Sequence, residues 1–163
     1  MSQSKILCGK CLDIIIVKAS QDDAGEILAL QKKAYQSEGK LNDDWTLPPL
    51  IETFPEIISE FETKVFLKAV CTNKIIGSVR ATLDSGTCQV GRLIVHPDYQ
   101  GKGIGTSLMS RIEATFSHAK RFELFTGTKS INNIRFYQRL GYREFCEGDL
   151  SPKVRLLFME KLR

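Results

Sequence analysis

Three alternating glycines and a lysine mark the stretch of this chain whose residue types and spacing point most clearly to chemistry. The stretch is Val95-His-Pro-Asp-Tyr-Gln-Gly-Lys-Gly-Ile-Gly-Thr106, in which Gly101, Gly103 and Gly105 allow tight turning and close approach of the backbone to a ligand. The first N–H groups of a helix lack internal partners and lie at the positive end of its dipole, so a helix that starts here suits an anion, phosphate above all. Lys102 adds a full positive charge. We therefore expect a phosphate-binding turn.

Two common phosphate-binding motifs do not fit this turn. The P-loop requires Ser or Thr directly after Gly-Lys, but Gly103 follows Lys102. The dinucleotide fingerprint requires a third glycine three places after the second, and that place is Thr106 when counted from Gly101 and Gly103.

The elements that must position this turn follow from apolar periodicity and turn signals. The pattern predicts strands at 13–19, 65–71, 75–84, 87–95, 121–126, 142–147 and 154–161, and helices at 22–37, 53–61, 103–117 and 130–140, with a polar loop at 37–49. The strand-helix-strand unit from Thr87 to Thr126 requires a parallel pair. We expect an α/β (α+β) fold: a single mixed, mostly antiparallel sheet of about seven strands, with helices on both faces.

Length and composition limit the class of protein. The 163 residues suit one domain, which we place at 13–163 after a flexible leader at 1–12. Neither a secretory signal nor an apolar run of bilayer length is visible, and five cysteines, an odd number, do not suggest a disulfide framework. We therefore expect reduced thiols and a cytoplasmic protein that does not enter a membrane.

Charge and cysteine spacing give little support to two other kinds of site. The net charge is +4, and no basic stretch is interleaved with aromatic residues, so we expect no nucleic-acid partner. Cys8-Gly-Lys-Cys11 has the spacing of half a zinc site, but no second Cys or His pair follows, so we expect no metal.

The glycine turn resembles the acyl-CoA-binding motif of the GNAT superfamily of N-acetyltransferases. That motif, Gln or Arg, two residues, Gly, one residue, then Gly or Ala, is matched by Gln100, Gly103 and Gly105. Upstream, Gly91-Arg-Leu-Ile-Val-His-Pro97 is similar to the fourth strand of the family. Downstream, Ser130-Ile-Asn-Asn-Ile-Arg-Phe-Tyr-Gln-Arg-Leu-Gly-Tyr142 is similar to a later helix that ends in Tyr, a short spacer and Leu-Gly-Phe/Tyr. The resemblance implies the acyl-CoA acyltransferase fold.

The resemblance also implies which residues bind acetyl-CoA, the cosubstrate. The strand end Leu93, Ile94 and Val95 would pair its backbone with the pantetheine arm. The pyrophosphate would be held by backbone amides of Gln100, Gly101, Lys102, Gly103, Ile104, Gly105 and Thr106. Ser130 stands where relatives usually have Asn, and Asn133, one turn on, offers a second amide. Lys102, Lys129, Arg135 and Arg139 form either a basic rim for the 3′-phosphate or a solvated helix face.

The transfer of an acetyl group from a thioester to an amine needs a proton donor, an oxyanion partner and a base. Tyr137 would lie near the sulfur and suits protonation of the leaving thiolate, although its helical position also suits core packing. A strand amide near Leu93 or Ile94, left unpaired by a bulge, would bond the oxyanion. The expected fourth strand carries no carboxylate, so Glu38, a water chain or the free amine itself remain candidates for the base. His96 suits a surface turn better than a base.

The resemblance thus implies an N-acetyltransferase that acts by direct attack of a primary amine in a ternary complex. The acceptor would be a small-molecule or peptide amine, lined by Tyr35, Glu38 and Trp45, and the protein a monomer or homodimer. The alternative is a CoA-binding sensor or scaffold of the same fold without catalysis. It is kept open because the fourth strand lacks the glutamate that many relatives place there, and because Ser130 departs from the family pattern.

Overall fold

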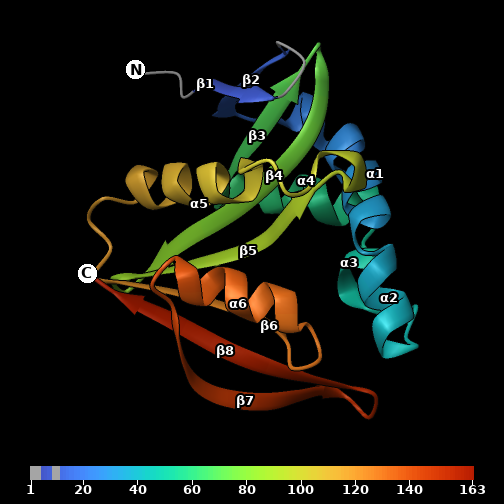
Figure 1. The fold of residues 1–163 in the computed structure, drawn as a ribbon, viewed down its shortest axis with the longest axis vertical. Coiled ribbons are helices and arrows are strands. Elements are labelled where there is room, and N and C mark those ends of the chain that lie inside the picture. Colours follow the sequence, from blue (N-terminus) through green and yellow to red (C-terminus); the bar gives the residue numbers. More distant parts are fainter. Residues whose placement is uncertain (1–4, 9–11) are drawn as a thin grey trace.

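The described residues build one sheet around which all helices are arranged (Figure 1). The computed structural model describes residues 5–8 and 12–163. Their eight strands lie in the order β1-β2-β3-β4-β5-β6-β8-β7, and only β5 and β6 pair in parallel. The bounds are β1 Lys5–Cys8, β2 Leu12–Lys18, β3 Val65–Cys71, β4 Lys74–Asp84, β5 Thr87–Val95, β6 Arg121–Gly127, β7 Arg143–Ser151 and β8 Val154–Leu162. The predicted mixed sheet is confirmed, and β1 is an additional strand within the segment that we expected to be a leader.

The helices begin and end at residues that favour such ends. Their bounds are α1 Ala24–Ala34, α2 Gln36–Asn42, α3 Pro48–Ile51, α4 Phe54–Thr63, α5 Ile104–Thr115 and α6 Ile131–Arg139. At the start of α4, Thr53 and Glu56 form a capping box, in which the backbone N–H of Thr53 donates to Glu56 Oε2 over 2.6 Å. After α6, Gly141 adopts φ 94°, a left-handed conformation that glycine adopts without strain.

The segment from 22 to 49 differs from the prediction of one helix and one loop. A 3₁₀ turn at Gln21–Asp23 precedes α1, the helix is interrupted at Tyr35, and α2 and α3 occupy most of the expected loop. Beyond this interruption Gly39 packs closely on Trp45, since a Cβ on Gly39 would lie only 2.8 Å from the indole ring. Glu38 therefore belongs to a separate helix, and this packing fixes where α2 lies.

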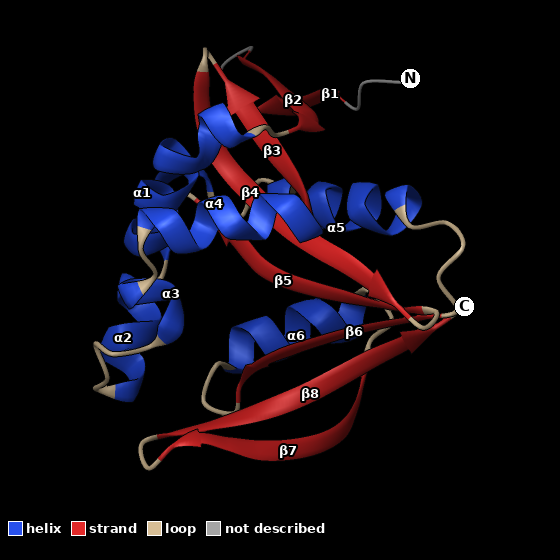
Figure 2. Ribbon diagram, turned by 180° about the vertical axis from the view of Figure 1, so that it is seen from behind, coloured by secondary structure: helices blue, strands red, loops and turns tan. Residues whose placement is uncertain are grey.

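Two apolar cores cover opposite faces of the sheet. One core packs α5 against the sheet through fully buried residues such as Leu108, Ile112 and Phe122. The other packs α1 and α4 through Ile27 and Ile57. Burial of each such side chain contributes about 1.5–3 kcal/mol to the free energy of unfolding. The prediction of helices on both faces is confirmed (Figure 2).

A buried polar network ties three helices to the middle of the sheet. Arg80 of β4 is almost fully buried, and its guanidinium donates to Glu52 over 3.2 Å and to Glu60 over 2.6 Å. It also donates to Gln31 of α1, whose own amide donates to Glu52 and to the carbonyl of Pro49. A buried charge is costly unless it is paired, so these partners fix the positions of α1, α3 and α4 relative to β4.

The parallel strands β5 and β6 separate after a short stretch of pairing. They pair only from Thr87 to Gln89 on β5, opposite 121–123 on β6. Beyond that point they diverge, with α6 packed beside the opening, in both ribbon views (Figures 1 and 2). The backbone of β5 from Val90 onward therefore has no strand partner on its β6 side among the described residues.

Candidate active site

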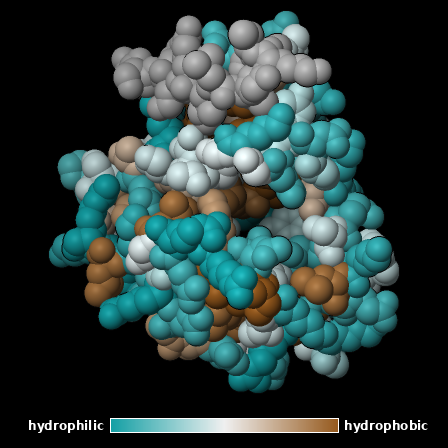
Figure 3. Space-filling model, in the orientation of Figure 1, coloured by the Kyte–Doolittle hydropathy of each residue, from teal (hydrophilic) through white to brown (hydrophobic). Residues whose placement is uncertain are grey.

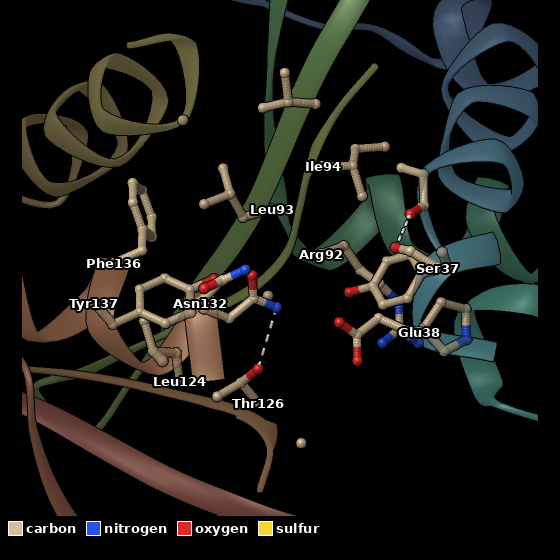
Figure 4. Close-up of a pocket in the computed structure, with 18 of the residues that line it drawn as sticks. Ser37, Glu38, Arg92, Leu93, Ile94, Leu124, Thr126, Asn132, Phe136 and Tyr137 are labelled. Atoms are coloured by element: carbon tan, nitrogen blue, oxygen red, sulfur yellow. Dashed lines mark hydrogen bonds between the residues drawn. The ribbon is translucent and has the colours of Figure 1, made fainter. Parts of the chain in front are cut away.

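A cavity of about 680 Å³ lies where β5 and β6 separate. It is lined by the end of β5, the glycine turn, the start of α5, β6, α6, the α1–α2 junction, the start of α3 with the residue before it, and the β7–β8 hairpin. The space-filling view shows a hollow in the middle of this face, with hydrophobic side chains at its base (Figure 3). The close-up shows Tyr137 and Phe136 on one side of the cavity and Glu38 and Arg92 on the other (Figure 4).

A bulge distorts β5 where it enters the cavity. Gly91 and Ile94 pair with residues of β4 that are only two apart, so Arg92 and Leu93 together face a single residue of β4. Arg92 adopts φ 50°, a left-handed conformation that is strained for a residue with a Cβ. Bulges of this kind redirect side chains and leave backbone groups unpaired. The bulge lies where the sequence analysis placed an unpaired strand amide.

The glycine turn leaves the start of α5 open toward the cavity. Gly101 and Gly103 have φ 74° and 80°, and a Cβ on either would meet no atom within 4 Å. No side chain caps α5, and its first internal hydrogen bond runs from Ser107 N–H to the carbonyl of Gly103. Gly105 has a different role, because a Cβ there would lie 3.3 Å from the ring of Phe136. The first two glycines thus form an open anion cradle, while the third lets α6 pack closely.

Most of the residues assigned to the cosubstrate line the cavity. This group comprises Leu93, Ile94, Val95, Gln100, Gly101, Gly103, Ile104, Gly105, Thr106, Asn133 and Tyr137. Lys102 and Ser130 are not among the lining residues: Lys102 is exposed and lies over the ring of Tyr99. Of the possible basic rim, only Arg139 lines the cavity. The side chain of Asn133 donates to the hydroxyl of Thr126, also in the cavity wall, over 3.5 Å.

Tyr137 reaches the cavity from α6 and is held by aromatic neighbours. Its ring contacts Phe136 and Tyr142 edge to face, with centroids 5.2 and 6.0 Å away. Burial raises the pKa of the Tyr137 phenol above its usual value of 10, and the negative forms of Tyr35 and Glu38 raise it further. The phenol therefore stays protonated across the physiological range and is available as a proton donor.

Glu38 and Ser130 are joined although 92 positions separate them in sequence. The Ser130 hydroxyl, 4% exposed in the residue as a whole, donates to Glu38 Oε2 over 2.6 Å. Ser130 is thus placed behind Glu38 rather than against the cavity, and it fixes the orientation of a carboxylate that does line it. This contact differs from the expected contact between Ser130 and the cosubstrate.

The structure also shows where His96, Trp45 and the candidate metal ligands lie. His96 is not a surface residue: it is 4% exposed, and its Nδ1 accepts the N–H of Asp98, so it stabilises the turn after β5. Trp45 is 52% exposed and does not line the cavity. Among described residues no group of three or more His, Cys, Asp or Glu side chains is placed to hold a metal. Cys11, half of the Cys-x-x-Cys pair, lies outside the described residues.

Several lining residues carry no signal that sequence reasoning used. Arg92 follows Gly91 within an apolar strand, and only knowledge of the bulge directs attention to it. Asn132 lies one position before the asparagine that we selected. A further group is apolar and comes from segments far apart in sequence: Leu47, Pro48, Pro49, Leu150, Val154 and Leu156.

Comparison with known proteins identifies the class to which this fold and site belong. Residues 62–144, just over half of the chain, match the family model described as acetyltransferase (GNAT) domain. The chain belongs to the GNAT acetyltransferase family, as its motifs indicated.

The similarity to individual sequences is partial. YdhI of Bacillus subtilis is 34% identical over 74 residues, covering 44% of this chain and 45% of YdhI. The uncharacterized N-acetyltransferase MJ1207 of Methanocaldococcus jannaschii is 38% identical over 58 residues, covering 34% of this chain and 26% of that protein. The matches therefore span less than half the length of these relatives.

Solved structures show the same fold at low sequence identity. The PaiA N-acetyltransferase of Thermoplasma acidophilum, in complex with coenzyme A, has a TM-score of 0.75 at 18% identity, covering 92% of this chain and 99% of that one. The ribosomal-protein-S18-alanine N-acetyltransferase of Escherichia coli has a TM-score of 0.75 at 14% identity, covering 91% and 93%. In the described part of the chain, no helix combines the length and apolar character needed to cross a bilayer.

Proposed function

We propose that the protein transfers the acetyl group of acetyl-CoA to a primary amine by direct attack in a ternary complex. The observation that carries the proposal is one cavity lined by the open start of α5, the bulged end of β5, Tyr137 and Glu38. The first two suit the donor of the acetyl group, and the last two suit the proton transfers of the reaction.

The residues present fit the donor. The amides of Ile104, Gly105 and Thr106 at the start of α5 would bind its pyrophosphate, since no side chain caps them and the space beside Gly101 and Gly103 is open. Beyond its pairing with β6, β5 has a free backbone edge, and an extended pantetheine arm would bind that edge as an added strand does. Bound there, acetyl-CoA supplies an acetyl thioester activated for attack by nitrogen.

Each protein group then has one task in the transfer. Glu38, oriented by Ser130, would take the proton that the amine must lose. The backbone amide of Leu93, at the bulge, would stabilise the negative charge that develops on the acetyl oxygen as the C–N bond forms. Tyr137 would give its proton to the thiolate sulfur as the C–S bond breaks. A phenol has a pKa near 10 even without burial, so this donor is protonated before the reaction.

Donor binding and turnover test this proposal together. Acetyl-CoA at 100 times its Kd should stabilise the protein by about 2.7 kcal/mol, which is about 5–10 °C in Tm for a chain of this size. A panel of amines, amino acids and aminoglycosides, with a thiol-detecting dye and mass spectrometry of the products, should reveal thiol release that depends on an acceptor. Binding without any acceptor-dependent release would contradict the enzymatic proposal and favour a CoA-binding sensor. No Tm shift at millimolar acetyl-CoA would contradict donor binding itself.

A further inference from the structure

A positive and a negative side chain face the acceptor side of the cavity without pairing with each other. Arg92 and Glu38 both line the cavity and lie on the same side in Figure 4, across from Tyr137. Within the described part of the chain, neither forms an ion pair. Nε of Arg92 is buried and has no hydrogen-bond partner. A buried donor without a partner is costly, which suggests that a ligand completes it.

The backbone of β5 is strained in a way that places Arg92 on this side. In a regular strand, alternate residues face the same side of the sheet. Here Val90, Leu93 and Val95 pack on the α5 core while Ile94 packs on the α1–α4 core, so the bulge shifts the alternation by one residue at Arg92. A left-handed φ at a non-glycine residue is strained, and such strained residues cluster at functional sites. The strain thus accompanies the placement of a guanidinium beside the α1–α2 junction.

Beside the polar side chains of Ser37 and Asn42 on α2, this end of the cavity has two apolar walls. Leu47, Pro48 and Pro49 contribute one wall, and Gln31 of the buried network holds this wall by donating to the carbonyl of Pro49 over 2.9 Å. The opposite wall is the β7–β8 hairpin, with Leu150, Val154 and Leu156.

The two apolar walls are joined at their outer ends. Lys153 of the hairpin donates to the carbonyl of Asp43 over 2.8 Å, and the hydroxyl of Ser151 donates to Asp44 over 3.4 Å. An acceptor bound between these walls therefore contacts apolar side chains on two sides and one side chain of each charge.

We propose that the acceptor is a small amino acid with a free carboxylate and an apolar side chain. Its amine lies toward Glu38, its carboxylate binds the guanidinium of Arg92, and its side chain packs between the two apolar walls. Arginine presents paired N–H donors that match both oxygens of a carboxylate, and such charge-assisted pairs are stronger than neutral hydrogen bonds. The same guanidinium disfavours polycationic acceptors such as polyamines. This inference rests on the proposed acetyl transfer.

Matched acceptors separate the carboxylate from the rest of the molecule. Thiol release should be measured with leucine, leucinamide, isoamylamine and spermidine at saturating acetyl-CoA, and the products identified by mass spectrometry. Because a hydrogen bond to a charged group contributes about 1.5–3 kcal/mol, kcat/KM for leucine should exceed that for isoamylamine by about 10- to 100-fold. Equal or better turnover of isoamylamine, leucinamide or spermidine would refute the inference while leaving acetyl transfer to amines in place. No release with any acceptor, from protein that binds acetyl-CoA, would refute the proposed function and this inference with it.

Arg92→Gln tests the assigned residue. It should lower kcat/KM for leucine by about 10- to 100-fold and change that for isoamylamine by less than about threefold, since the lost bonds are to the carboxylate. Arg92→Lys should restore part of the preference because it keeps the charge. Lys33→Gln, which removes a positive charge from the exposed face of α1, should change neither value. Equal losses for both acceptors in Arg92→Gln, with Tm and acetyl-CoA affinity unchanged, would show that Arg92 does not bind the carboxylate.

Discussion

Replacing Tyr137 by phenylalanine tests the proposed proton donor with little disturbance of its surroundings. The substitution keeps the ring, and therefore the edge-to-face contacts with Phe136 and Tyr142. It removes the hydroxyl whose pKa burial raises, so the variant has no protonated phenol beside the leaving sulfur. If Tyr137 protonates the thiolate, turnover should fall by about 10²–10⁴-fold.

The same substitution should have small effects on binding and stability. A neutral hydrogen bond contributes about 0.5–1.5 kcal/mol, so acetyl-CoA affinity should change by about tenfold at most. A loss of 1 kcal/mol corresponds to about 2–4 °C in Tm for a domain of this size. Turnover at saturating substrates, acetyl-CoA affinity and Tm should be measured on one preparation.

Tyr142→Phe is the matched control. The Tyr142 hydroxyl donates to Glu113 over 2.9 Å, and Tyr142 is buried in the α5 core and does not line the cavity. Loss of the Tyr142 hydroxyl leaves the Glu113 carboxylate with one hydrogen-bond partner fewer, so Tm should fall while turnover stays near that of the wild type. A general acid should contribute far more than a threefold rate enhancement. If Tyr137→Phe retains turnover within about threefold of the wild type, Tyr137 is therefore not the acid. If its activity falls only in proportion to Tm, Tyr137 serves in packing.

Three further perturbations address other parts of the site and its support. Gly103→Val should abolish detectable acetyl-CoA binding, because a branched side chain would enter the open anion cradle at a residue with φ 80°. The control is Gly86→Val, which introduces the same kind of strain at φ 82° outside the cavity and should lower Tm by a similar amount but leave acetyl-CoA affinity intact. Equal acetyl-CoA affinity in the two variants would place the phosphate site elsewhere. Ser130→Ala should lower turnover by about tenfold with acetyl-CoA affinity unchanged, since it removes a charge-assisted bond to Glu38. Ser130→Thr keeps a hydroxyl and should restore much of the lost turnover. An unchanged rate in Ser130→Ala would show that this contact does not position the base. Burial opposes ionisation of Glu60, but its bonds to Arg80 outweigh burial and lower its pKa below 4.5, so the stability it contributes is present above that pH and lost as pH falls through the lowered pKa. Glu60→Gln should therefore reduce the acid dependence of Tm below about pH 4.5, and an unchanged pH profile would contradict this role.

Local signals allowed much of the fold to be predicted. The Thr53–Glu56 capping box, the stop at Gly141 and the glycine turn at 101–105 each depend on residues within a few positions of one another. Such patterns determine the local backbone largely independently of the rest of the chain. The parallel placement of β5 and β6 followed from the helix between them, because a strand-helix-strand unit has few possible topologies.

Features that depend on distant contacts could not be predicted in this way. The packing of Gly39 on Trp45 joins two turns of the 22–49 segment, and the charge of Arg80 is buried only because α1, α3 and α4 bring partners to it. The contact between Ser130 and Glu38 likewise requires the folded sheet. Arg92 was missed because a bulge breaks the alternation on which strand analysis relies.

The walls of the cavity come from different parts of the chain, and this has a consequence for how the activity can change. The donor side is built from β5, the glycine turn, α5 and α6, all within the segment that the family shares. Glu38, the Leu47–Pro49 wall and the hairpin residues Leu150, Val154 and Leu156 lie outside that segment. Substitutions in the two flanking segments, or an exchange of these segments between family members, can therefore change acceptor preference without altering the binding site of the acetyl donor. Laboratory evolution toward new acceptors is best directed at residues 35–49 and 150–156, with the central segment held constant.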